Sequence, residues 1–362
     1  MPTKLHRRLA DLIEESGPIP VSAFMDLCLR DPRDGYYATR PRLGAEGDFI
    51  TAPHVSQMFG ELIGLWAAET WTRMGRPERL RLVELGPGDG TMVSDVLRAA
   101  SAAPEFLSAC ELWLVEQSAP LRAAQQSALA KARLSPRWTD DWRSVPGDLP
   151  LIVIANEFLD CFPIRQFVRG PDGWLERRVA LGKDGALAFQ AVPPSLHPAA
   201  CADLEAAPGG AVLEISSALA AFGGAIGALI ARATGAALFI DYGDEGAGFG
   251  DTLQAIRGHA REPALDNPGE ADLTAHVDFA AFLGAARRAG AKACAIRTQG
   301  DFLRELGIEA RAAALARSRP DRAGEIGRQL ERLTGADGMG ALFKVGCIHS
   351  AGLSPPGLTA GR

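Results

Sequence analysis

The feature that most constrains the fold is a run of alternate glycines directly after a short apolar segment. Residues 80–85 predict a strand, and Gly86-Pro-Gly-Asp-Gly90 follows it without a break. Residues 91–100 then have the apolar spacing of a helix. Glycines at such a turn let the backbone approach a ligand closely at the carboxyl end of a parallel strand. The segment therefore predicts a strand–loop–helix unit of an α/β domain, with a ligand site at the loop.

Strand and helix patterns alternate along the rest of the chain. The further predicted strands are residues 112–116, 151–155, 237–242, 292–297 and 341–348, with a short strand near residues 137–138. Several of these segments are apolar on both faces, which is typical of strands in a parallel sheet covered by helices on both sides. The pattern therefore favours the α/β class.

Some stretches of the chain fall outside this alternation. Residues 1–78 predict an N-terminal helical cap and lid, and residues 79–349 predict the core. Insertions into the core are expected at about 164–234, which includes short β ribbons, and at about 244–276. Residues 350–362 are rich in Gly and Pro and predict a flexible tail.

Composition excludes several classes of protein. A net charge of −6 over 362 residues argues against nucleic acid as a partner. No run of about 18 uninterrupted apolar residues occurs, so no membrane insertion is expected. The six cysteines lack zinc-site spacing, so no metal is predicted, and unpaired thiols favour a cytoplasmic location. Arg greatly outnumbers Lys, which favours a bacterial source.

The glycine loop distinguishes between two cofactors. The NAD fingerprint G-x-G-x-x-G would place its third glycine where Thr91 stands, so a dehydrogenase is disfavoured. The form E-x-G-x-G-x-G is instead found in methyltransferases that use S-adenosyl-L-methionine. That ligand carries a sulfonium, an amino-acid end, a ribose and an adenine, and it has no pyrophosphate. The residues expected to contact it are Glu84, Gly86, Pro87, Gly88 and Gly90.

Acidic residues at the next strand ends are the other candidates for cofactor contacts. Glu116 could accept hydrogen bonds from both ribose hydroxyls, although a dehydrogenase would use an acid in the same way. Asp140 or Asp141 could accept a hydrogen bond from the adenine amino group. Each of these residues has a structural alternative, because acids at strand ends are often solvated or cap helices.

Several further motifs occur in a characteristic order. They are Gly47-Asp-Phe-Ile-Thr51, Asn156-Glu-Phe-Leu-Asp160, Asp241-Tyr-Gly243 and Asp272-Leu-Thr-Ala-His-Val-Asp-Phe279. With the glycine loop, they make the chain resemble the MidA-like family of methyltransferases over roughly residues 5 to 349. This family includes the mitochondrial arginine methyltransferase that assists assembly of respiratory complex I.

The resemblance implies a Rossmann-like, seven-stranded class I methyltransferase sheet with an N-terminal helical cap and an inserted lobe. It implies methyl transfer from S-adenosyl-L-methionine to arginine in a protein such as a complex I core subunit. A second copy of the chain is a further candidate partner. Asp48 and Thr51 are expected to close over the cofactor. His54 stands where the family usually has an acid, and Cys161 where it has a small residue.

The candidate catalytic residues lie at or just beyond the ends of two predicted strands. They are Asn156, Glu157, Asp160, Asp241 and His276, and Asn156 is also a candidate cofactor contact. An arginine guanidinium stays protonated, and carboxylates can localise its charge away from the nitrogen that accepts the methyl group. Helix capping is the alternative role for the acids, and a lone histidine is more often structural.

Two classes of function remain open from the sequence. The first is a protein arginine methyltransferase. The second is a non-catalytic assembly or binding factor on a methyltransferase fold, and the fold alone does not decide between them. The intact glycine loop together with Glu116 favours the enzyme.

Overall fold

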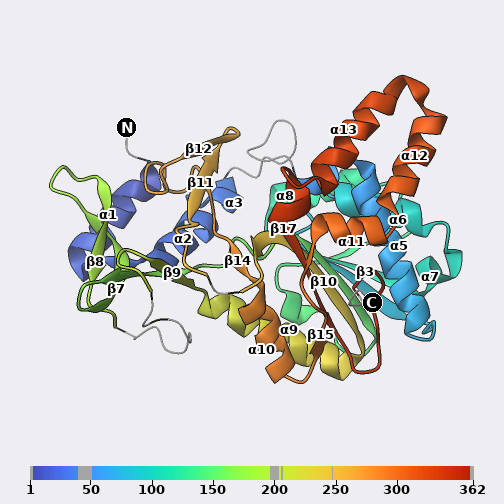
Figure 1. Cartoon of the computed structure of the whole chain (residues 1–362), viewed down its shortest axis with the longest axis horizontal. Coiled ribbons are helices and arrows are strands. Elements are labelled where there is room, and N and C mark those ends of the chain that lie inside the picture. Colours follow the sequence, from blue (N-terminus) through green and yellow to red (C-terminus); the bar gives the residue numbers. More distant parts are fainter. Residues whose placement is uncertain (1–2, 40–50, 196–203, 205–206, 247, 359–362) are drawn as a thin grey trace.

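The computed structural model describes residues 3–39, 51–195, 204, 207–246 and 248–358 (Figure 1). A nine-stranded mixed sheet forms the larger part of the molecule, and seven of its strands form one continuous path. In spatial order this path is β15 (Lys292–Ala293), β17 (Phe343–His349), β10 (Gly235–Asp244), β5 (Leu151–Asn156), β2 (Leu80–Leu85), β3 (Cys110–Val115) and β4 (Arg137–Thr139). The short strands β14 (Val277–Asp278) and β16 (Arg297–Thr298) pair with β10 and β17.

The strand directions explain where a ligand can bind. Strands β2, β3, β4, β5 and β10 are mutually parallel, and β17 runs antiparallel beside β10. The carboxyl ends of the parallel strands therefore meet at one edge of the sheet, where ligands bind in such folds. This arrangement confirms the predicted α/β class.

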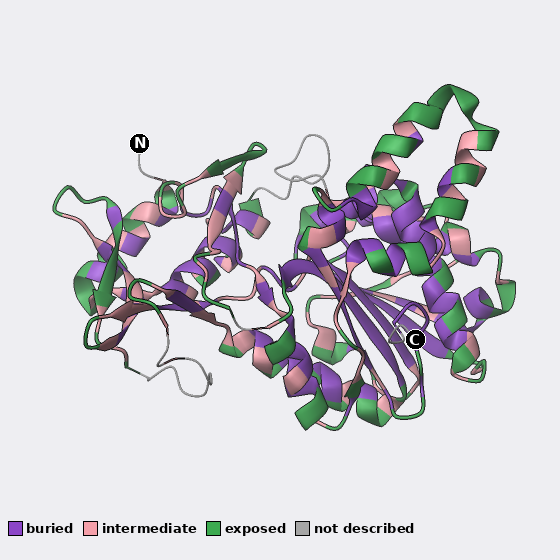
Figure 2. Cartoon of the chain, in the orientation of Figure 1, coloured by how far each residue is buried: buried purple, intermediate pink, exposed green. Residues whose placement is uncertain are grey.

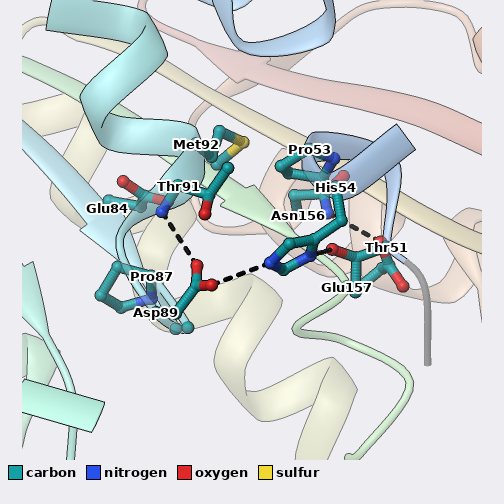
Figure 3. Close-up of a pocket in the computed structure, with 12 residues that line it drawn as sticks. Thr51, Pro53, His54, Glu84, Pro87, Asp89, Thr91, Met92, Asn156 and Glu157 are labelled. Carbon is teal, nitrogen blue, oxygen red and sulfur yellow. Dashed lines mark hydrogen bonds and ion pairs between the residues drawn. The ribbon is translucent and has the colours of Figure 1, made fainter. Parts of the chain in front are cut away.

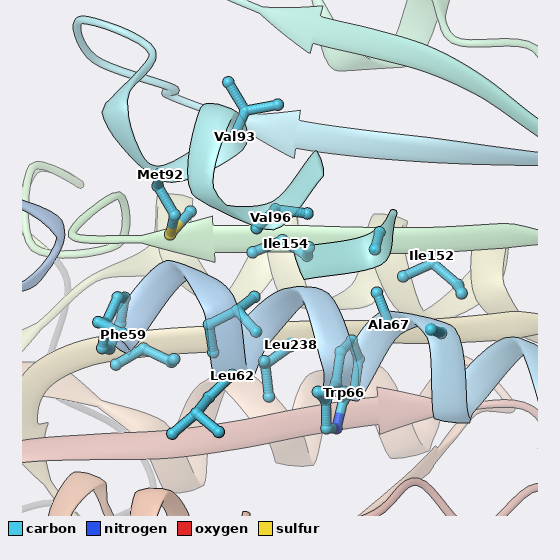
Figure 4. Packing of buried hydrophobic residues seen from close by; sticks show 14 of the residues in the cluster. Phe59, Leu62, Trp66, Ala67, Met92, Val93, Val96, Ile152, Ile154 and Leu238 are labelled. Carbon is cyan, nitrogen blue, oxygen red and sulfur yellow. The ribbon is translucent and has the colours of Figure 1, made fainter. Parts of the chain in front are cut away.

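Helices cover both faces of this sheet. One face carries α5 (Gln57–Arg73) and α6 (Thr91–Ala100), whose apolar side chains pack on β5 and β10 (Figure 4). The opposite face carries α9 (Ser217–Ala233) and α10 (Phe279–Arg288). Because both faces are covered, β2 and β5 are buried along their whole length (Figure 2).

The remaining helices of the larger part lie around the sheet and at its edges. They are α4 (Ala52–Val55), α7 (Pro104–Ala109), α8 (Ala119–Ala128), η2 (Trp142–Ser144), α11 (Gln299–Glu305), α12 (Ile308–Ser318), η3 (Pro320–Arg322), α13 (Ala323–Thr334) and α14 (Met339–Leu342). Helices α12 and α13 form a hairpin that extends away from the sheet and is largely exposed (Figures 1 and 2).

A smaller lobe lies at the left of Figure 1 and has its own hydrophobic core. Its sheets contain β1 (Ile19–Pro20), β6 (Arg165–Gly170), β7 (Gly173–Leu181), β8 (Leu187–Val192), β9 (Val212–Ile215), β11 (Gln254–Arg257), β12 (Ala260–Glu262) and β13 (Asp272–Thr274). Helices α1 (Lys4–Ser16), α2 (Val21–Arg30) and α3 (Tyr36–Thr39) pack against these strands.

The lobe is thus assembled from stretches that are far apart in the sequence. Residues 1–78 were expected to form one N-terminal unit, yet α1–α3 join the lobe while α5 packs on the main sheet. The expected insertion at 164–234 is divided in the same way, because α9 covers the main sheet. Apolar periodicity identifies a buried helix face and does not identify its partner, which explains these differences.

The end of the described chain also differs from the expected flexible tail. Leu353 and Leu358 are 7% and 3% exposed and belong to the core of the main domain. Because these two side chains pack into that core, residues 351–358 are held against the main domain. Within the described residues, no helix is both long and apolar enough to cross a bilayer.

Candidate functional site

A cavity opens at the carboxyl ends of β2 and β5 (Figure 3). It is lined by Thr51, Pro53, His54, Glu84, Gly86, Pro87, Gly88, Asp89, Thr91, Met92, Asn156 and Glu157. These residues come from α4, the end of β2, the glycine loop, the start of α6 and the end of β5. The cavity therefore brings together most of the cofactor residues expected from the sequence. Asp48 lies outside the described residues.

The glycine loop needs its glycines for conformational reasons. Gly86, Gly88 and Gly90 have φ angles of 63°, 57° and 89°. Residues that carry a Cβ atom rarely adopt such positive φ angles. A Cβ atom on Gly86 would lie 3.1 Å from the ring of Phe158. The loop is consequently a narrow cradle, and any substitution at Gly86 would strain the loop itself as well as the ligand site.

Glu84 places a buried carboxyl group at the wall of the cavity. Its side chain is 4% exposed, and burial, followed by the charge of Asp89, raises the pKa of Glu84 to about 8. A cation bound next to such a carboxyl group stabilises its ionised form, because the cation offsets the free-energy cost of burying the negative charge. Glu84 therefore suits a cationic ligand group such as an ammonium.

Asn156 and Glu157 form the other wall, at the end of β5. The Asn156 Nδ2 atom donates to Glu157 Oε1 at 2.9 Å, and the backbone N–H of Ala52 donates to the same oxygen at 3.3 Å. Within the described part of the chain, Glu157 Oε2 accepts no hydrogen bond, and the buried Asn156 Oδ1 has no partner. One acceptor on each residue is thus available to a ligand.

Glu157 is also held in a strained backbone conformation. Its φ angle is 51°, which costs a non-glycine residue on the order of 1–3 kcal/mol. Burial, and then the charge of Asp160, raises the pKa of Glu157 to about 7. A strained, partly desolvated acid at the end of a central strand is typical of a functional group rather than a solvated cap.

Asp241 holds the loop that carries Glu157. Its Oδ2 accepts the backbone N–H groups of Phe158, Leu159 and Asp160 at 2.9, 2.7 and 3.2 Å. Its Oδ1 accepts the N–H of Tyr242 at 2.9 Å, and the side chain is fully buried. The structure therefore places Asp241 behind the site as an anchor of the loop. Among the expected catalytic residues, it is the one with no exposed surface.

Asp160 and His276 lie at a different, smaller cavity, which is also lined by Glu214 and Asp278. Burial raises the pKa of Asp160 to about 6. His276 Nδ1 lies 3.2 Å from Asp244 Oδ2, so the histidine has a local partner. Of the predicted catalytic residues, Asn156 and Glu157 thus line the first cavity, Asp160 and His276 line the second, and Asp241 lines neither.

Glu116 is linked to the glycine loop by a residue that the sequence analysis missed. The side chain of Gln125 is fully buried, and its Nε2 donates to Gly88 O at 2.7 Å and to Glu116 Oε2 at 3.3 Å. Its Oε1 accepts the indole N–H of Trp138 at 2.8 Å. Gln125 therefore joins the ends of β2, β3 and β4. A glutamine inside a predicted helix gives no sequence signal for such a role.

The two acids expected near adenine have different surroundings. The Asp141 side chain accepts the backbone N–H of Arg143 at 2.9 Å as the N-cap of η2. It also forms an ion pair with the guanidinium of Arg143 at 2.8 Å. Asp140 is exposed. Neither residue lines the cavity. Asp141 caps η2, and Asp140 is the more accessible of the two.

His54 connects α4 to the glycine loop across the cavity (Figure 3). Its Nε2 lies 2.9 Å from Asp89 Oδ2, and its Nδ1 lies 2.7 Å from Thr51 Oγ1. Asp89 Oδ1 in turn accepts the N–H of Thr91 at 3.0 Å. Since Ala52 also contacts Glu157, helix α4 bridges the ends of β2 and β5.

We expect this bridge to stabilise the protein most at low pH. The hydrogen bond with Asp89 raises the pKa of His54. The folding stability that this interaction contributes is therefore fully present below the ordinary histidine pKa of about 6.5, and it is lost as the pH rises through the pKa of His54 in the folded protein. Thermal melts should show a larger loss of Tm for His54→Gln at pH 6 than at pH 8.5. An equal loss at both pH values would contradict the prediction, and Asp89→Asn should abolish the pH dependence.

Comparisons with known proteins agree with this geometry. Residues 62–297 match the model of a family of S-adenosyl-L-methionine-dependent methyltransferases. The chain is 33% identical to mouse "Protein arginine methyltransferase NDUFAF7, mitochondrial", and the match covers 92% of this chain and 80% of the relative. The corresponding homolog of Caenorhabditis elegans is 33% identical, with 88% and 80% covered.

A solved structure from Burkholderia thailandensis, bound to S-adenosyl-homocysteine, is similar to the whole chain. Its TM-score is 0.83 at 29% identity, covering 99% of this chain and 93% of the other. A native structure from the same organism gives a TM-score of 0.81 at 28% identity, covering 99% and 92%.

Proposed function

This chain belongs to the MidA-like family of S-adenosyl-L-methionine-dependent methyltransferases, and on that basis we propose that it methylates arginine side chains of a protein substrate. The observation that carries the proposal is the accessible Oε2 of Glu157, a partly desolvated carboxylate at the end of β5. Relatives named as protein arginine methyltransferases support the choice of arginine.

The residues of the cavity fit S-adenosyl-L-methionine. The glycine loop lines the cavity with backbone alone at Gly86 and Gly88, Glu84 can pair with the ammonium of the amino-acid end, and Asn156 has an unpartnered buried oxygen. Glu116, at the next strand end, is suited to the ribose hydroxyls. When bound, the cofactor supplies an electrophilic methyl group on its sulfonium.

The residues of this chain would act mainly by positioning the substrate. Glu157 accepts hydrogen bonds from the guanidinium and localises its positive charge away from the reacting nitrogen. Asn156 and Ala52 fix Oε1 of this carboxylate, so its orientation is set before the substrate binds. Asp160 has a raised pKa on the same loop and is a second candidate for holding the cation.

Glu116→Ala should weaken binding of S-adenosyl-L-methionine at least tenfold. Each hydrogen bond to a charged group contributes about 1.5–3 kcal/mol, and two bonds to the ribose are lost. Calorimetric titration measures the dissociation constant, and Asp172→Ala, in the exposed turn between β6 and β7, is a control. Unchanged affinity would mean that Glu116 only caps the start of α8, where it accepts the N–H of Ser118 at 2.8 Å.

The proposed substrate is a core subunit of respiratory complex I, whose assembly the methylation would assist. The resemblance to the family supports this substrate. The curated relatives are named as mitochondrial proteins, so the cytoplasmic location and the bacterial source stay predictions. A homodimer likewise stays a prediction.

The test combines the purified protein, the complex I core subunit and S-adenosyl-L-methionine with a labelled methyl group. Mass spectrometry should place the label on arginine, and the same modification should disappear in a deletion strain. Methylation of another residue type would contradict the arginine assignment. Cofactor binding without any transfer would favour a non-catalytic assembly factor.

A further inference from the structure

A pair of cysteines lies side by side at the edge of the main sheet, away from both cavities. Strand β15 pairs antiparallel with β17, with Lys292 opposite His349 and Ala293 opposite Ile348. The register continues by one residue, because the backbone N–H of Cys294 donates to the carbonyl of Cys347 at 3.0 Å. Cys294 and Cys347 are therefore direct cross-strand neighbours.

This register brings the two thiols to the same face of the sheet. Directly opposite residues of antiparallel strands have Cα atoms about 4.5–5.5 Å apart, which lies within the range that a disulfide spans. Cys347 is fully buried in the main core, and Cys294 packs against the same core while remaining partly exposed. One thiol is thus accessible to a reagent and the other is protected behind it.

The charged groups around Cys294 favour its thiolate. His349 lies on the same face, two residues beyond Cys347, and its Nδ1 lies 3.0 Å from the carbonyl of Ser350. Arg287 donates to the carbonyls of Ala293 and Cys294 at 3.3 Å. The hydrogen bond from Cys347, followed by that from His349, lowers the pKa of Cys294.

We propose that Cys294 is a thiol-modification site that exchanges with low-molecular-weight disulfides and then forms a reversible disulfide with Cys347. The Cys294 thiolate attacks one sulfur of the reagent, forming a mixed disulfide and releasing one reagent thiolate. Burial raises the pKa of the Cys347 thiol, so Cys347 loses its proton as it attacks Cys294 Sγ, forming the Cys294–Cys347 bond and releasing the second reagent thiolate. Two protein thiols are oxidised, the reagent is reduced to two thiols, and the protons pass to the released thiolates.

The other described cysteines provide a contrast within the same chain. Burial raises the pKa of Cys110 and of Cys161 to about 12 in each case, and it also raises the pKa of Cys28. Cys161 is partly exposed like Cys294, so it is a matched control for accessibility. Cys201 lies outside the described residues and is replaced by serine in every variant.

The test is the reaction of the folded protein with the aromatic disulfide DTNB at pH 6, where an ordinary thiol of pKa near 8.5 is almost entirely protonated. The Cys201→Ser protein should show a fast phase that releases two equivalents of the coloured thiol. Adding Cys294→Ser should remove that phase, whereas adding Cys161→Ser should leave it unchanged. A fast phase that survives Cys294→Ser would overturn the proposal.

Replacing the second cysteine separates exchange from ring closure. Cys347→Ala should release one equivalent and retain a mixed disulfide, which intact mass spectrometry detects. After treatment with oxidised glutathione, the protein with both cysteines should instead be lighter by two hydrogens and carry no glutathione adduct. Release of two equivalents from Cys347→Ala would refute the pairing, and melting curves establish that each variant is folded.

Discussion

Glu157→Gln should lower the rate of methyl transfer by about 10²-fold or more, the size of one lost electrostatic contact in a desolvated site. Glutamine is nearly isosteric and keeps an oxygen for the contacts from Asn156 and Ala52. It carries no negative charge, so it cannot localise the charge of the guanidinium. Affinity for the cofactor should change by less than about twofold, because that ligand does not depend on the carboxylate charge.

The measurement is kcat with a saturating protein substrate, beside a calorimetric titration with S-adenosyl-homocysteine. Asp172→Asn is the control, since Asp172 is an exposed acid in the turn between β6 and β7, away from the cavity. In the wild-type protein, kcat/KM, measured below substrate saturation, should rise with pH through about 7, because burial raises the pKa of Glu157 to about 7 in the free protein and the ionised form is required. A wild-type rate in Glu157→Gln would transfer the role to Asp160, the second acid of the same loop.

Although Glu157→Gln should lower the rate of methyl transfer, it should raise the thermal stability of the protein at neutral and higher pH. The pKa of Glu157 is raised on folding, so the folded state binds more protons than the unfolded state between about pH 4.3 and about 7. Wild-type stability therefore falls through this window as the carboxylate ionises. Glu157→Gln should match the wild-type Tm at pH 4.5 and exceed it at pH 8. Unfolding of the variant would instead identify Glu157 as a structural acid.

Asp241→Ala should lower the free energy of unfolding by at least about 3 kcal/mol. The substitution leaves the N–H groups of Phe158, Leu159 and Asp160 without their shared acceptor inside the protein. Each unsatisfied buried donor costs about 1–3 kcal/mol, and water entering the gap recovers part of this. Asp241→Asn keeps one carbonyl acceptor, so a smaller loss is expected.

Chemical denaturation followed by circular dichroism measures this loss, with Asp244→Ala as the matched control. Asp244 lies on the same strand, but its side chain is 62% exposed and contacts only His276 among the described residues. Its replacement should cost less than about 0.5 kcal/mol. A cost of under about 1 kcal/mol for Asp241→Ala would show that its four backbone contacts do not hold the loop.

The sequence predicts the part of the site that depends on local chain geometry. Positive φ angles at Gly86 and Gly88 follow from the glycine pattern, and a polar residue after a long apolar run locates Asn156 at the end of a central strand. Both signals lie within a few residues. The α/β class follows from the same kind of pattern, repeated along the chain.

The missed features depend on contacts between distant segments. An acid at a strand end has the same sequence signal whether it faces a ligand or accepts backbone N–H groups, so Asp241 could not be distinguished from Glu157. Gln125 has its partners at the ends of β2, β3 and β4, and Cys294 is beside Cys347 through strand register alone. Local periodicity contains no information on such pairings.

Calorimetric titration of the full chain with S-adenosyl-L-methionine tests the central claim, that the cavity at the carboxyl ends of β2 and β5 is the cofactor site. Saturable binding of one cofactor per chain is expected, weakened at least tenfold by Glu116→Ala and unaffected by Asp172→Ala. Absence of binding to the wild-type protein at millimolar cofactor, or equal affinity in all three proteins, would contradict it.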